Sequence, residues 1–194
     1  MSDGATIAPA ILLAGGGFLG GGKVLEVLSR HDLVRQALVA AVARGEIEKR
    51  DALFLNLRIR GYSTRAAARH WQLLRTDGGL ARAERRFLQL DLLFPLVYGA
   101  AFAGGLWLLR GALERRADTG WLIAPVVIGV LADWVENFIQ LRELDRFLRG
   151  ERLQTGWIRI ASVATIVKLI SLSGAVLLIV LGVIWGVAKA LSTT

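Results

Sequence analysis

The sequence predicts an all-α protein: a polytopic transmembrane helical bundle with three firm spans, a fourth at the N-terminus, and a basic helical cytoplasmic segment. Two observations predict this class. Apolar residues make up 54% of the 194 residues, and the mean hydropathy is +0.50, both higher than in an ordinary soluble domain. Charged residues still make up 21%. The apolar residues must therefore be gathered into blocks rather than spread along the chain.

Three blocks reach the length of about 20 mostly apolar residues that a helix needs to cross a bilayer. The first runs from Leu92 to Leu109. The second starts at Trp121 and is apolar only in its first half. The third, from Leu169 to Ala188, lies between two lysines and is the clearest of all. These blocks predict three membrane spans.

The glycine-rich N-terminal stretch, residues 7–22, can be interpreted in two ways. Its "AGGGFLG" is similar to the glycine turn of short-chain dehydrogenases and epimerases, but Ala14 occupies the first position of that turn. A nucleotide site would also need a βαβ unit, and a helical pattern follows instead. Glycines are common where membrane helices pack closely. Without a positively charged n-region, the stretch predicts an uncleaved membrane anchor.

The region between the anchor and the first firm span is basic and helical in pattern. Val24 to Arg44 carries apolar residues close to a helical repeat. Gly61 ends one element, and Ser63 or Thr64 can cap the next helix. Asp77-Gly78-Gly79 predicts a turn. The chain then divides into a glycine-rich N-terminal membrane segment, a basic helical cytoplasmic region and a three-span bundle: residues 1–22, 23–91 and 92–194.

Positive charge predicts the topology. Residues 23–91 contain fourteen Lys and Arg, and the loop at 142–159 adds five on the same side. Because cytoplasmic loops accumulate Lys and Arg, this side is expected to face the cytoplasm of a bacterium, with the chain in the inner membrane. Trp107, Trp121 and Trp185 then lie near the outer interface, as an aromatic belt would.

Composition also excludes several classes of site. The chain has no cysteine, which excludes disulfides and thiolate metal sites, and neither of its two histidines lies in a long apolar run. We therefore expect no metal and no cofactor. The net charge of +8 is explained by arginine-rich membrane flanks, so we expect no nucleic-acid partner.

Polar residues form a stripe in the second span. Asp133, Glu136, Asn137 and Gln140 are spaced at i, i+3, i+4 and i+7, so they share one helix face. Asp133 lies about 18 Å along this helix from Trp121, at 1.5 Å per residue. A carboxylate facing lipid at this depth would cost about 2.5–3.5 kcal/mol. The stripe is therefore expected to face other helices or water.

Antiparallel neighbours bring further polar groups to the same depth. The first span enters from the cytoplasm with Asp91 and Tyr98, and the last enters with Lys168. The expected intramembrane cluster therefore contains Asp91, Tyr98, Asp133, Glu136, Asn137 and Lys168. One interpretation is structural, with ion pairs and hydrogen bonds joining the helices. The other is a working site, because three carboxylates against one lysine leave an excess of acid.

Two short patterns carry a resemblance. "DLLFPLVYG" and "ADWVENFIQL" resemble small uncharacterised polytopic bacterial membrane proteins in which a D-x-x-F-P-x-x-Y span precedes a D-x-x-E-N span. Asp91 and Tyr98 fit the first pattern, and Asp133, Glu136 and Asn137 fit the second. The resemblance covers about residues 53–141. It implies a four-helix membrane topology and brings no activity with it.

These observations lead to one expected function and two alternatives. The small size, glycine-rich faces and lack of a catalytic set favour a non-enzymatic accessory or assembly subunit of a membrane complex. Its partners would be membrane lipids and other membrane subunits. The first alternative is a carrier of protons or small solutes that uses Asp133 and Glu136. The second is a lipid-modifying enzyme acting from the cytoplasmic side, with no catalytic residue identified.

Overall fold

The computed structural model describes residues 4–48, 54–110 and 119–192, and every regular element in these ranges is helical. The prediction of an all-α fold is confirmed. The elements in chain order are α1 (Gly4–Ser29), α2 (His31–Ala43), η2 (Leu55–Leu57), α3 (Thr64–Arg75), α4 (Gly78–Asp91), α5 (Phe94–Arg110), η3 (Thr119–Ile123), α6 (Ala124–Leu148) and α7 (Thr155–Ser192).

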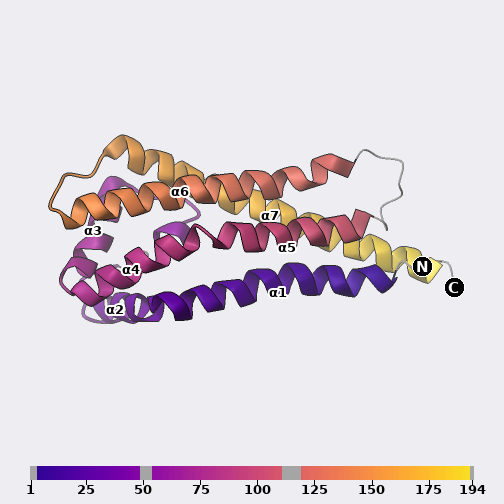
Figure 1. The fold of residues 1–194 in the computed structure, drawn as a ribbon, viewed down its shortest axis with the longest axis horizontal. Helices are drawn as coiled ribbons and strands as arrows, with labels where there is room; N and C mark the ends of the chain where they lie inside the picture. Colours follow the sequence, from indigo (N-terminus) through magenta and orange to yellow (C-terminus); the bar gives the residue numbers. More distant parts are fainter. Residues whose placement is uncertain (1–3, 49–53, 111–118, 193–194) are drawn as a thin grey trace.

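The helices form an elongated bundle. Helices α1, α5, α6 and α7 run along the long axis, while α2, α3 and α4 gather at one end (Figure 1). Four stretches are long and apolar enough to cross a membrane, namely Ala8–Ser29, Gly78–Leu109, Trp121–Leu148 and Thr155–Lys189. The N-terminal stretch is thus a candidate span like the other three. The architecture is that of a membrane helical bundle.

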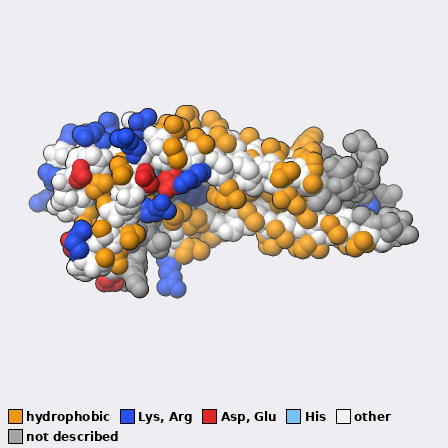
Figure 2. Space-filling model, turned by 90° about the horizontal axis from the view of Figure 1, so that it is seen from below, with side chains coloured by type: hydrophobic (Ala, Val, Ile, Leu, Met, Phe, Trp, Pro, Cys, Tyr) orange, Lys and Arg blue, Asp and Glu red, His pale blue; other side chains and the backbone are white. Residues whose placement is uncertain are grey.

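Charge and apolar surface are segregated along the bundle. Figure 2 shows Lys and Arg side chains gathered over the end that holds α2, α3 and α4, with hydrophobic side chains spread over the rest of that face. Helix α7 has 38 residues and is about 57 Å long at 1.5 Å per residue. It therefore extends well beyond a hydrocarbon layer of about 30 Å. Its N-terminal part packs with α6 beside the basic end.

Three local predictions differ from the structure. The boundary expected after residue 22 falls inside α1, which continues to Ser29 because no breaker follows the glycines. The helical pattern of Val24 to Arg44 is divided at Arg30, whose φ of +57° interrupts it. The expected turn at Asp77 is a helix start. The Asp77 carboxylate accepts a hydrogen bond from the Gly79 N–H at 2.6 Å, as an N-cap does.

The capping prediction for the next helix is confirmed. Ser63 precedes α3, and its Oγ accepts a hydrogen bond from the Ala66 N–H at 3.2 Å. The helix then buries Trp71 and Leu74 against α6, in the core of the basic end. A second core lies further along the bundle, between α1, α5, α6 and α7. The cluster of polar residues lies between these two cores.

Candidate functional site

The six residues expected to form an intramembrane cluster lie together inside the bundle. They come from the end of α4, the first turns of α5, the middle of α6 and the N-terminal half of α7. All are buried, with exposures between 0% and 6%. The residues are Asp91, Tyr98, Asp133, Glu136, Asn137 and Lys168.

Lys168 joins two of the carboxylates. Its Nζ lies 3.0 Å from Asp133 Oδ1 and 2.5 Å from Glu136 Oε2. Asp133 and Glu136 are three residues apart, so they occupy adjacent positions on one face of α6. One ammonium from α7 therefore spans both acids. An ammonium and carboxylates removed from water in this way are favourable only when paired and hydrogen-bonded.

Neutral side chains also donate hydrogen bonds to these two carboxylates. The Tyr98 hydroxyl donates to Asp133 Oδ2 at 2.8 Å, and Asn137 Nδ2 donates to Asp133 Oδ1 at 3.0 Å. The Thr165 hydroxyl and Gln140 Nε2 both donate to Glu136 Oε1, at 2.6 and 2.9 Å. Each carboxylate thus has two neutral donors besides Lys168. Such sets of donors stabilise the ionised form of a carboxyl group.

Helix α6 also supports the interruption between α4 and α5. Asn137 Nδ2 donates to the Asp91 carbonyl at 3.2 Å, and Trp134 Nε1 donates to the Leu92 carbonyl at 2.8 Å. Carbonyls at a helix end lack intrahelical partners and must find others when they are buried. Two side chains of α6 therefore stabilise the break where the chain passes from α4 into α5.

Sequence reasoning missed several members of this hydrogen-bonded set. Gln140 lay in the predicted stripe but was not assigned to the cluster, and it also donates to the Tyr62 hydroxyl at 3.0 Å. Thr165 precedes Lys168 by three residues, a spacing that places both on one face of α7. Tyr62 lies in the extended segment before α3, and no local pattern indicated it. Burial and the Glu136 charge raise the pKa of Tyr62, so its hydroxyl stays protonated.

A second buried polar set lies at the basic end. Glu84 of α4 contacts two histidines, with His31 Nε2 at 2.7 Å and His70 Nε2 at 3.5 Å. Phe54 and Phe87 stack on the His31 ring, with centroids 4.3 and 3.8 Å away. This set joins α2, α3 and α4. No group of three or more acidic or histidine side chains in the described ranges is arranged to hold a metal ion.

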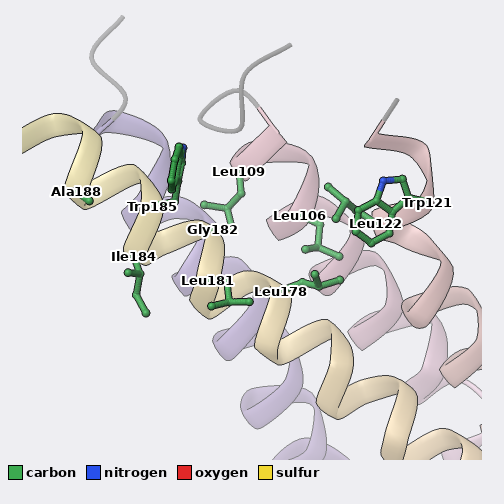
Figure 3. Close-up of a pocket in the computed structure, with 10 residues that line it drawn as sticks. All are labelled: Leu106, Leu109, Trp121, Leu122, Leu178, Leu181, Gly182, Ile184, Trp185 and Ala188. Carbon is green, nitrogen blue, oxygen red and sulfur yellow. The ribbon is translucent and has the colours of Figure 1, made fainter. Parts of the chain in front are cut away.

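The opposite end of the bundle carries an apolar groove of about 510 Å³. It lies between α5, η3 and the end of α7, and Figure 3 shows Trp121 and Trp185 at its two sides. These tryptophans lie at the end of the bundle away from the basic helices. The groove is lined by Leu106, Leu109, Trp121, Leu122, Leu178, Leu181, Gly182, Ile184, Trp185 and Ala188.

Comparisons with known proteins do not assign the chain to a family. No protein-family model, curated protein or solved structure matches the chain. The resemblance in the "DLLFPLVYG" and "ADWVENFIQL" segments therefore stays a prediction. The geometry alone describes the site: it is a closed polar core that can carry charge or a proton and that joins α4, α5, α6 and α7.

Proposed function

We propose that this protein is a non-enzymatic accessory or assembly subunit that packs against other subunits of a membrane complex. The observation that carries the proposal is the outward face of α1. Only 11% of the most apolar stretch of α1 is buried, against 44% for each of the two stretches that contain α5 and α6. Leu12 and Leu19 are 73% and 72% exposed on this helix.

Four glycines of α1 form two pairs with different surroundings. A side chain at Gly17 would meet Ala101, and one at Gly21 would meet Phe94 at 2.8 Å, so this pair packs closely against α5. A Cβ at Gly16 or Gly20 would meet nothing within 4 Å. Gly16 and Gly20 are spaced four residues apart, the spacing that allows two membrane helices to approach closely. The first pair is used within the chain, and the second is free for a helix of a partner.

The polar cluster fits the same role. Asp133 and Glu136 contact Lys168 and neutral donors of the same chain, which holds α5, α6 and α7 in register. A rigid bundle with one small-residue face is suited to docking. The excess of arginine at the end with α2, α3 and α4 supports placing this end on the cytoplasmic side of a bacterial inner membrane. Anionic lipid headgroups would contact these arginines.

The test is native purification of the chain and of a variant with Gly16→Leu and Gly20→Leu. We expect a membrane protein to co-purify in stoichiometric amount with the native chain and to be lost from the variant, because leucines on this face hold a neighbouring helix away. Mass spectrometry of the purified complexes measures the stoichiometry. Neither position packs against the described part of the chain, since a Cβ at Gly16 or Gly20 meets nothing within 4 Å, and circular dichroism of the variant checks that its helix content is unchanged.

The matched control is Gly156→Leu on α7, where a Cβ also meets nothing within 4 Å. This variant should keep the partner. A native chain that purifies alone as a monodisperse species would contradict the proposal, as would a partner that stays bound to the double variant.

A second candidate is a carrier of protons or small solutes, favoured by the excess of buried acid over Lys168. For this function Asp133→Asn should abolish flux into lipid vesicles that contain the purified protein, while circular dichroism shows an unchanged helix content. Flux that survives this substitution would remove the carrier hypothesis. The subunit proposal expects no such flux from the native chain.

A further inference from the structure

The charges of the buried cluster do not balance. Asp91, Asp133 and Glu136 carry three negative charges when ionised, and Lys168 supplies one positive charge. Uncompensated charge in a membrane interior is costly, and a buried carboxyl group without a cation takes up a proton instead. The distribution of hydrogen-bond donors indicates which of the three acids does so.

The donors are unevenly shared. Asp133 accepts hydrogen bonds from Tyr98, Asn137 and Lys168. Glu136 accepts hydrogen bonds from Thr165 and Gln140 and forms an ion pair with Lys168. Asp91 is 4% exposed, its carboxyl group forms no ion pair with any residue that the structure describes, and the neutral Asn137 amide is the side chain that hydrogen-bonds to it. Asp133 and Glu136 thus each have the ammonium and two neutral donors, whereas Asp91 has one neutral donor and no ion pair.

The side chain that contacts Asp91 carries an unpartnered acceptor. The Asn137 amide uses its Nδ2 to donate to the Asp91 carbonyl and to Asp133, and its Oδ1 is buried without a hydrogen-bond partner in the described part of the chain. A buried acceptor left in this way costs about 1–3 kcal/mol. A protonated carboxyl group is a donor, whereas a carboxylate is only an acceptor. A proton on Asp91 would therefore supply the kind of group that is missing here.

We propose that Asp91 binds a proton at neutral pH in the folded protein, which makes the cluster a proton-binding site. This inference does not depend on the proposed role as a subunit. With Asp91 neutral, one net negative charge is shared by Asp133 and Glu136 through Lys168 and four neutral donors.

Among the described groups packed around Asp91, the cation is Lys168, which already pairs with both Asp133 and Glu136. Helix α6 contributes two acids, α7 contributes Lys168, and α5 contributes the Tyr98 hydroxyl. On α1, Lys23 pairs with Glu26 at 2.7 Å at the surface. From α2 and α3, the histidines contact Glu84, two turns before Asp91 on α4.

Infrared spectroscopy of the purified full chain in lipid membranes tests the proposal. We expect the native protein at neutral pH to show the C=O stretching band of a protonated carboxyl group, and the Asp91→Asn variant to lack it. The control is Glu143→Gln, which should keep the band. Glu143 is also buried, but its Oε2 accepts a hydrogen bond from the Gln154 N–H at 2.8 Å, and Arg146 lies nearby at 3.9 Å.

Thermal unfolding supplies a second measurement. Asparagine has the shape and charge of protonated aspartic acid, so Asp91→Asn should unfold within about 2 °C of the native protein, while Asp133→Asn should lose about 4 °C or more. The proposal is overturned if the native chain has no protonated-carboxyl band, if Asp91→Asn keeps it, or if Asp91→Asn destabilises the protein as much as Asp133→Asn. The proposal is also overturned if the Asp91→Asn variant does not fold, because asparagine resembles the protonated aspartic acid and should be accepted at this position.

Discussion

Replacing Lys168 by methionine should destabilise the protein by about 3–5 kcal/mol, the typical cost of leaving a buried charge without its partner. The substitution keeps the length of the side chain but removes the cation from both Asp133 and Glu136, which Lys168 contacts at 3.0 and 2.5 Å. The free energy of unfolding, measured by denaturant titration in mixed micelles, gives the loss directly.

A double variant shows how much of this loss belongs to the ion pair. Asp133→Asn combined with Lys168→Met removes both charges, so its loss should be smaller than the sum of the two single losses, by about 0.5–3 kcal/mol. If the pair is purely structural, the double variant should lose little more than either single variant. If the stability losses of the two single variants add up in the double variant, Asp133 and Lys168 do not stabilise each other.

The control for Lys168 is Lys23→Met. Lys23 also contacts a carboxylate, Glu26, at 2.7 Å, but its side chain is 68% exposed. Exposed ion pairs contribute about 0–1 kcal/mol, so this variant should be nearly neutral. Equal losses at the two lysines would mean that burial does not decide the effect.

Replacing Gly61 by alanine is expected to cost about 2–5 kcal/mol, from two causes. Gly61 has a φ of +70°, a conformation that costs an L-residue about 1–2 kcal/mol. A Cβ there would also collide with Ser162 Oγ of α7 and would approach Ile166 Cδ1 to 3.2 Å. Overpacking of this kind costs about 1–3 kcal/mol more. Ser162 cannot turn away freely, because its Oγ accepts the Tyr62 N–H at 2.8 Å.

Gly45 separates the two causes. Its φ is +72°, close to that of Gly61, but a Cβ at Gly45 would meet nothing within 4 Å. Gly45→Ala should therefore lose only the conformational part, about 1–2 kcal/mol. The free energies of unfolding of the two variants should differ by the collision with α7. If the two losses are the same, the close contact between Gly61 and α7 does not contribute.

Much of the architecture could be predicted because the signals are local. Segregation of apolar residues into blocks of about 20 indicates membrane helices whatever their packing. The spacing of Asp133, Glu136 and Asn137 places them on one face of any α-helix. The errors were also local: Arg30 adopts a left-handed conformation that few non-glycine residues adopt, and Asp77 caps a helix where its glycines suggested a turn.

The contacts between distant segments could not be predicted in the same way. Tyr62 meets Gln140, which is 78 residues away, and His31 meets Glu84, which is 53 residues away. Such contacts depend on how each helix is rotated and tilted against its neighbours, and no spacing within one helix carries that information. Trp134 was not singled out in the sequence, yet it supports the break between α4 and α5.

The sequence by itself determined that this protein is a bundle of apolar helices with a basic end and an acidic stripe, because residue type and helical spacing decide those properties. The tertiary structure alone decided how the donors are shared among the three buried acids. Packing brings two carboxylates to Lys168 and leaves Asp91 without a cation. That difference in surroundings, rather than any difference in residue type, distinguishes the acids chemically.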